Sequence, residues 1–246
     1  MLSILFGLLS AAGWGASDFV GGLSARRAGA FQSVLFVEII SLFLLPLAAL
    51  GLNEPLISWQ EWLWCAAAGG FGVVALALLF QAFVDGQMSI AAPVSAVISA
   101  ILPILVSLFT EGIPEPGRLA GFLLALLAIW FITWGGKGTE KLHLHLKTIQ
   151  LPLLAGIGFG LYFILIHHGS QHGLIWPMIA SRGVGMMILA AILLKQRKNL
   201  FPSRDTWPLL MLNFILDIAA NVAYIRAGQL GRMDVAAVLT SMYPGF

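Results

Sequence analysis

The chain has 246 residues, of which 59% are hydrophobic and only 10% charged, and its mean hydropathy is +0.94. Soluble globular proteins carry about 25% charged residues, so this composition excludes a soluble globular protein and indicates an integral membrane protein. The formal net charge of +2 gives no support to a nucleic-acid partner, because the basic residues gather in the segments between apolar runs. The single cysteine, Cys65, has no second cysteine with which to form a disulfide or a thiolate metal site.

Apolar segments follow one another along the whole chain. A membrane-spanning helix needs about 20 apolar residues, and all but the last of these segments are close to that length. The last segment would rise only about 20 Å as a helix, against about 30 Å of hydrocarbon. We therefore predict an all-α polytopic membrane protein with spans at 2–22, 31–51, 62–84, 90–109, 118–135, 151–168, 174–194 and 207–228 and part of a ninth at 234–246.

The chain also contains an internal repeat. Residues 9–92, moved forward by 144 or 145 positions, fall on 154–237, with Trp62 on Trp207 and Met88 on Met233. Five helices per repeat is an odd number, so the second repeat would enter the membrane inverted, as in many secondary transporters. The same offset predicts that the second repeat continues for about 35 residues past the end of this sequence. The expected plan is ten helices, with the first repeat at 1–136, a basic polar linker at 137–149 and the second, truncated repeat at 150–246.

Basic residues divide unevenly between the two sides of the predicted bundle. Loops after odd-numbered helices carry nine Lys or Arg, and loops after even-numbered helices carry three. Because cytoplasmic loops are enriched in Lys and Arg, this asymmetry places the nine in the cytoplasm and the N-terminus outside. The nine are Arg26, Arg27, Lys137, Lys141, Lys147, Lys195, Arg197, Lys198 and Arg204, and the three are Arg118, Arg226 and Arg232.

The first span carries one carboxylate, Asp18, shortly after Trp14, and we expect both residues to lie on the substrate or ion pathway. Gly7, Ala11 and Gly15 recur every four residues, which is typical of close helix packing, and Asp18 comes three residues later. Burial in an apolar bundle favours the protonated form of a carboxylate, so Asp18 is a candidate for binding and releasing a proton. The alternative is that it reaches the headgroups or pairs with a basic residue at 26–27.

Glu38 and Arg182 occupy corresponding positions in the two repeats, each inside an apolar run. A charge at the bilayer centre costs about 2.5–3.5 kcal/mol on insertion scales, so each needs a partner or a task. Both lie about 12–13 Å deep, from opposite faces of about 30 Å of hydrocarbon. We predict an ion pair across the repeat interface. The alternative is that Arg182 binds an anionic substrate.

The eighth span carries a polar stripe. Its members are spaced four, four and three residues apart, so they share one helix face. The corresponding positions of the first repeat are apolar or small, which favours a ligand-binding wall. The alternative is a set of interhelical hydrogen bonds, each worth about 0.6 kcal/mol on average. The stripe consists of Asn213, Asp217, Asn221 and Tyr224.

Prolines in the fourth span and the ninth segment predict kinks or cavity-lining helices, because each frees a backbone carbonyl inside the bilayer. These are Pro93, Pro103 and Pro244. A static packing kink is the alternative.

His168 and His172 have the spacing of a helical metal pair, but no acidic cluster lies beside them in the sequence. The two histidines of the polar segment, His143 and His145, also have no acidic cluster beside them. We expect no metal site.

Several motifs resemble EamA-type members of the drug/metabolite transporter superfamily. The resemblance implies ten helices in two inverted five-helix repeats, a central cavity, and export or exchange of small metabolites. It also implies cytoplasmic termini, unlike the charge count, and it fixes no substrate. The motifs are Trp14 to Phe19, Ala91-Ala92-Pro93-Val94 through Leu102-Pro103-Ile104, Glu111 with Gly121, Asp217-Ile218-Ala219-Ala220-Asn221, and Ser241-Met242-Tyr243-Pro244.

We therefore expect a secondary active transporter, an exporter or exchanger of a small organic metabolite or drug, working by alternating access in the plasma (inner) membrane. No cofactor and no enzymatic activity are expected, and a proton gradient or exchange would supply the driving force. The expected partners are the lipid bilayer, a small-molecule substrate and, as an option, a second copy in a homodimer, with no nucleic acid. The alternative is a non-transporting membrane subunit or truncated module that packs against another membrane protein.

Overall fold

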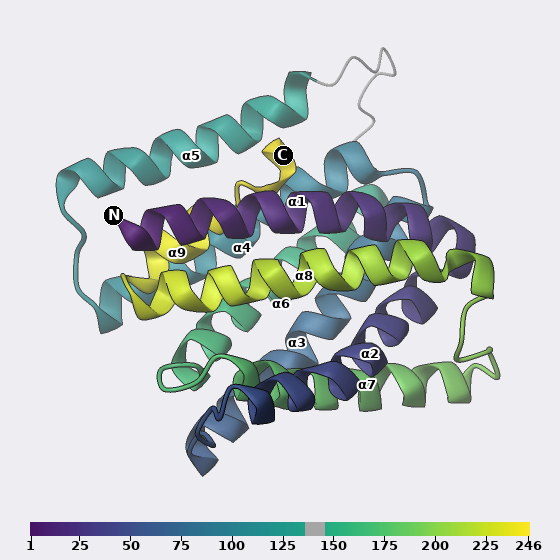
Figure 1. Cartoon of the computed structure of the whole chain (residues 1–246). Helices are drawn as coiled ribbons and strands as arrows, with labels where there is room; N and C mark the ends of the chain where they lie inside the picture. The colour runs from purple at the N-terminus through teal and green to yellow at the C-terminus, as the bar shows by residue number, and fades with distance from the viewer. Residues whose placement is uncertain (136–145) are drawn as a thin grey trace.

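The computed structural model describes residues 1–135 and 146–246 (Figure 1). Within these ranges the chain forms nine α-helices, two short 3-10 turns and no strand, which confirms the predicted all-α membrane class. The helices are α1 (Leu2–Ala28), α2 (Ala30–Gly51), α3 (Trp59–Val84), α4 (Met88–Thr110), α5 (Pro116–Gly135), α6 (Leu146–Gly169), α7 (Ile175–Lys195), α8 (Trp207–Gln229) and α9 (Met233–Thr240), and the 3-10 turns are η1 (Arg204–Thr206) and η2 (Tyr243–Gly245).

Seven of the described helices are long and apolar enough to cross a membrane, namely α1 to α4 and α6 to α8. In α5 the described apolar stretch, Pro116–Ile129, is shorter. Large apolar side chains face outward on these helices, as Phe43 and Leu47 of α2 do, at 72% and 66% exposed. Outward apolar faces are what a lipid environment favours, so the protein is a multi-pass membrane protein.

Helix boundaries differ from the predicted ones where local capping decides them. α3 begins at Trp59 instead of residue 62, because Ser58 and Glu61 form a capping box. In it the Glu61 amide donates to Ser58 Oγ at 3.3 Å, and the Ser58 amide donates to Glu61 Oε2 at 2.8 Å. α1 continues to Ala28 and is followed by the capping residue Gly29, whose φ of 90° suits glycine.

The ninth segment was predicted as part of a span over 234–246; a helix forms at its beginning, but the predicted end is wrong. α9 ends at Thr240 and the chain then turns through η2. Pro244 lies in that turn, so it kinks no helix here. Proline lacks the amide that a continuing helix would need. Pro93 and Pro103, in contrast, both lie inside α4 as predicted.

A charged cluster joins the beginning of α9 to the end of α4. Arg232 donates to Asp234 Oδ2 at 2.8 Å and to the Glu111 carbonyl at 2.9 Å. Ser107 of α4 donates to the same Asp234 oxygen at 3.0 Å. The hydrogen bond with Asp234 raises the pKa of Arg232 above its ordinary value, so the guanidinium stays charged.

The helices pack in pairs that combine the two halves of the chain. α1 lies along α8, α3 along α6 and α2 along α7. The contacts are close because small residues meet: a Cβ added at Gly13 would lie 2.9 Å from the Ala220 Cβ, and one at Gly158 would lie 2.8 Å from the Ala75 Cβ. Close approach of backbones at small residues is a main source of helix association in membranes.

The crossing of α3 and α7 provides a test of this packing. A Cβ at Gly69 would overlap with the carbonyl oxygen of Ser181, whereas one at Gly70 would find Ile188 Cδ1 at 3.6 Å, an ordinary contact. We expect Gly69→Ala to destabilise the protein by about 1–3 kcal/mol, as overpacking does. Gly70→Ala, the matched control, should leave stability unchanged or raise it by up to about 1 kcal/mol, since glycine is unfavourable inside helices. Thermal unfolding of both variants in detergent checks this, and equal midpoints would contradict it.

Candidate functional site

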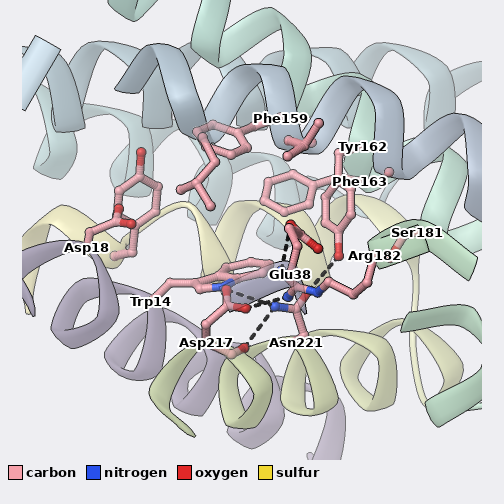
Figure 2. A pocket seen from close by; sticks show the side chains of 15 residues that line it. Trp14, Asp18, Glu38, Phe159, Tyr162, Phe163, Ser181, Arg182, Asp217 and Asn221 are labelled. Carbon is pink, nitrogen blue, oxygen red and sulfur yellow. Dashed lines mark hydrogen bonds and ion pairs between the residues drawn. The ribbon is translucent and has the colours of Figure 1, made fainter. Parts of the chain in front are cut away.

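A small cavity of about 70 Å³ lies inside the bundle, lined by residues of α1, α2, α3, α6, α7, α8 and η2. Its polar side chains include Asp18, Glu38, Arg182, Asp217 and Asn221 (Figure 2). These are five of the predicted pathway residues, and they come from four helices, α1 and α2 in the first half of the chain and α7 and α8 in the second. The fold therefore gathers the charges of the apolar spans around one space.

Arg182 is held between two carboxylates. Its Nη1 donates to Glu38 Oε1 at 3.1 Å, and its Nη2 pairs with Asp217 Oδ2. All three residues are buried, with exposed fractions of 8% for Arg182, 3% for Glu38 and 7% for Asp217. The predicted contact between Glu38 and Arg182 is confirmed. The second partner, Asp217, was not predicted, and its presence shows that both ends of the guanidinium are occupied.

Hydrogen bonds extend this ion pair across the cavity. Trp14 Nε1 donates to Asp217 Oδ1 at 3.2 Å, and Asn221 Nδ2 donates to the same oxygen at 3.1 Å. The Tyr162 hydroxyl donates to Asn221 Oδ1 at 2.5 Å. The side chains of α1, α6, α7 and α8 are thus tied into one network, which fixes the orientation of each (Figure 2).

Glycines of α3 and α7 make room for the network. A Cβ at Gly72 would lie 2.8 Å from Tyr162 Cδ2, and one at Gly185 would lie 3.3 Å from the carboxyl carbon of Glu38. Asp217 and Asn221 are four residues apart on α8, so they face the same way. The local sequence therefore combines one polar face with small residues opposite it.

Asp18 lines the same cavity, apart from the ion pair. Figure 2 shows it at the other end of the group from Arg182, beyond Trp14. It is 9% exposed, and within 1–135 and 146–246 no group hydrogen-bonds its carboxylate. Arg26 instead donates to the Phe83 carbonyl at 3.2 Å. The ion pairs of the described residues include none between Asp18 and the basic residues at 26–27, so the alternative pairing is not seen there.

The other half of the predicted polar stripe serves packing. Asn213 accepts a hydrogen bond from Ser17 Oγ at 2.7 Å, and Tyr224 donates to the Phe163 carbonyl at 3.1 Å. Neither lines the cavity. For these two residues the structure agrees with the alternative of interhelical hydrogen bonds. The stripe is thus divided between the cavity and the helix interface.

Pro93 and Pro244 line a second, wider hollow beside α1, which shares Asp18 and Tyr243 with the central cavity. Pro103 lines neither space. The hydroxyl of Tyr243 contacts Ser95 Oγ of α4 at 2.7 Å.

The histidines give no group of metal ligands among the described residues. His172 lies 2.8 Å from Glu61 Oε1 and its side chain is 82% exposed. His143, His145, Lys137 and Lys141 lie outside the described residues.

Sequence reasoning missed the aromatic wall of the cavity. Phe159, Tyr162 and Phe163 all come from α6. The repeat offset of 145 places Phe159 on Trp14, and that correspondence was the signal available. Tyr162 and Phe163 fall on Ser17 and Asp18, which are not aromatic. The tilted ring contact of Trp14 with Phe163, at 5.6 Å between ring centroids, joins this wall to α1.

The shared guanidinium predicts an order of stability among variants. Arg182→Gln leaves two buried carboxylates unpaired, whereas Glu38→Gln leaves Arg182 with Asp217. Breaking a buried pair costs about 3–5 kcal/mol, so we expect Arg182→Gln to lower the thermal midpoint more than Glu38→Gln does. The exchange Glu38→Arg with Arg182→Glu should not restore stability, because the new glutamate would face Asp217. Recovery in the exchange variant, measured by thermal unfolding, would contradict the role given to Asp217.

Comparison with known proteins places the chain in a family of membrane transporters, which agrees with its membrane-spanning helices and central cavity. The profile of the EamA-like transporter family matches residues 1–134, more than half of the chain. No curated protein matches the chain. The family match confirms the resemblance found in the motifs, and it lies in the half that supplies Trp14, Asp18 and Glu38. The chain belongs to the EamA-like transporter family of the drug/metabolite transporter superfamily.

Proposed function

We propose that this protein is a secondary active transporter that exports or exchanges a small organic solute across the plasma membrane. The observation that carries the proposal is the central cavity, which both halves of the chain line and which holds the buried network around Arg182. Ionisable residues inside a membrane bundle are costly and mark substrate or ion pathways. Membership of a transporter family agrees with this role.

We further propose that the two halves are inverted repeats. Gly13 packs on Ala220 and Gly158 packs on Ala75, and the offset of 145 that takes Gly13 to Gly158 also takes Ala75 to Ala220. Each of these contacts therefore has its repeat equivalent in the other contact. Glu38 and Arg182 are repeat equivalents that contact each other, which is expected of residues close to a two-fold axis. These pairings support the inverted plan.

The size of the cavity supports alternating access. It holds about 70 Å³, enough for only a few water molecules. Pockets that bind small molecules measure about 300–1,000 Å³, so the helices around it must separate to admit a solute. Rocking of one repeat against the other would widen the cavity toward one side at a time. We propose a proton gradient or solute exchange as the driving force, with no bound cofactor.

The direct test is transport by the purified chain in proteoliposomes. A panel of labelled cations, anions, zwitterions and neutral solutes is offered in a counterflow assay, with protein-free liposomes as the baseline. We expect at least one solute to accumulate only where the protein is present. If none exceeds the baseline, the non-transporting alternative is favoured and the proposal fails.

Two tyrosines give a matched pair of variants for the transported solute. Tyr162→Phe removes a hydroxyl that lines the cavity and holds Asn221, so we expect the KM to rise about two- to tenfold, the value of one hydrogen bond. Tyr224→Phe removes a buried hydroxyl outside the cavity, and should leave the KM unchanged while lowering stability by about 1 kcal/mol. Equal effects of the two on KM would argue against the cavity as the binding site.

A further inference from the structure

The charges that line the central cavity do not balance. Asp18, Glu38 and Asp217 supply three carboxylates, and Arg182 is the only arginine or lysine among the described residues that line it. A net charge in a space of low dielectric is expensive unless something neutralises it. The cavity therefore favours an occupant that brings positive charge.

Arg182 is not available to an anion. Its Nη1 and Nη2 are each paired with a carboxylate, and an anionic solute would have to displace one of them while lying near the others. The earlier alternative, in which Arg182 binds an anionic substrate, is therefore disfavoured by the geometry around it.

Two acceptors in the cavity have no donor. Glu38 Oε2 is buried without a hydrogen-bond partner, although Oε1 of the same group is paired. The Asp18 carboxylate also accepts no hydrogen bond within the described residues; the residue is nine-tenths buried, and it borders both the central cavity and the wider hollow. A buried acceptor without a partner costs about 1–3 kcal/mol, and more if it is charged. A ligand that donates hydrogen bonds or carries positive charge would lower this free-energy cost for both acceptors.

The apolar part of the lining is aromatic. Trp14, Phe159, Tyr162 and Phe163 border the same space as the carboxylates, and Figure 2 shows Trp14 and Phe159 between Asp18 and the ion pair. A cation over an aromatic face gains about 0.5–2 kcal/mol. Aromatic faces beside unpaired carboxylates are the chemistry that recognises an organic cation.

We propose that the cavity binds a small organic cation with an apolar or aromatic body, whose positive charge is balanced by the carboxylates of Asp18 and Glu38. This inference rests on the proposed transport function, because it names the class of solute that the same cavity takes. The competing occupant is the proton alone, which would neutralise the carboxylates without any solute.

Equilibrium binding to the purified full chain tests the charge preference without requiring transport. The probes share a phenyl body and differ in charge: benzyltrimethylammonium, 2-phenylethanol and 3-phenylpropionate. Benzyltrimethylammonium is a quaternary ammonium ion with no proton to lose, so its own charge does not depend on pH. We expect it to bind at least about tenfold more tightly than the neutral probe, and the anion most weakly, as measured by calorimetry and by the rise in Tm that a ligand produces.

Asp18→Asn is the decisive variant, because Asp18 has no partner to lose. It should weaken benzyltrimethylammonium binding about tenfold while leaving the Tm of the ligand-free protein unchanged or raised. Glu38→Gln, which keeps the shape of the side chain, should weaken binding as well. Asp85→Asn is the control: it removes one negative charge from an exposed residue of the α3–α4 turn, where the carboxylate accepts only from Gln81 at 2.9 Å, and should leave binding unchanged.

The results separate this inference from the transport function. Equal affinity for the three probes, a preference for the anion, or no binding of any of them would overturn the cation site. So would normal affinity in Asp18→Asn. Transport of an anion or neutral solute without cation binding would refute the cation site alone, whereas cation binding without transport of any solute would refute only the transporter.

Discussion

The structure depends on one buried interaction, the guanidinium of Arg182 held between Glu38 and Asp217. In a membrane bundle none of these charges can reach bulk water, so each must keep its partner within hydrogen-bond distance. This requirement fixes α2, α7 and α8 relative to one another, and the hydrogen bonds from Trp14 and Asn221 to Asp217 extend it to α1 and to α6 through Tyr162. The cavity lies where it does because these helices must converge on one arginine.

Convergence of this kind is possible only because small residues surround the charges. Gly185 lies beside Glu38, and Gly69 lies against the backbone of Ser181, next to Arg182. Lipid tails are as apolar as leucine, so association of helices in a bilayer relies on close packing and on polar contacts. The α1–α8 interface uses both: Gly13 meets Ala220, and Ser10 donates to the Ala220 carbonyl at 2.9 Å. The glycines therefore allow the close helix approach that the buried charges need in order to reach one another.

The sequence predicts the fold better than the site, for physical reasons. Hydropathy locates the spans, and the repeat offset with the depth of each charge brings Glu38 to Arg182. Depth says nothing about the rotation of α8, however, so Asp217 as second partner was not foreseen. Helical spacing groups Asn213 and Tyr224 with Asp217 and Asn221, yet one broad face borders both the cavity and a packed interface, and only the structure separates them. Short-range capping at Ser58 and the turn at Pro244 likewise override the hydropathy pattern at helix ends.

An isolated arginine in an apolar span suggests an anion site, and the structure shows why that reasoning is incomplete. What a solute meets is the sum of the charges around the cavity, and here carboxylates outnumber the guanidinium. On the proposal of a cation site, departure of the cation leaves that excess exposed in a medium of low dielectric, and protons are the simplest ions that can replace it. Release of the solute and uptake of protons would then be linked by electroneutrality alone. A coupling to the proton gradient would follow from the charge balance of the cavity, without a separate device to enforce it.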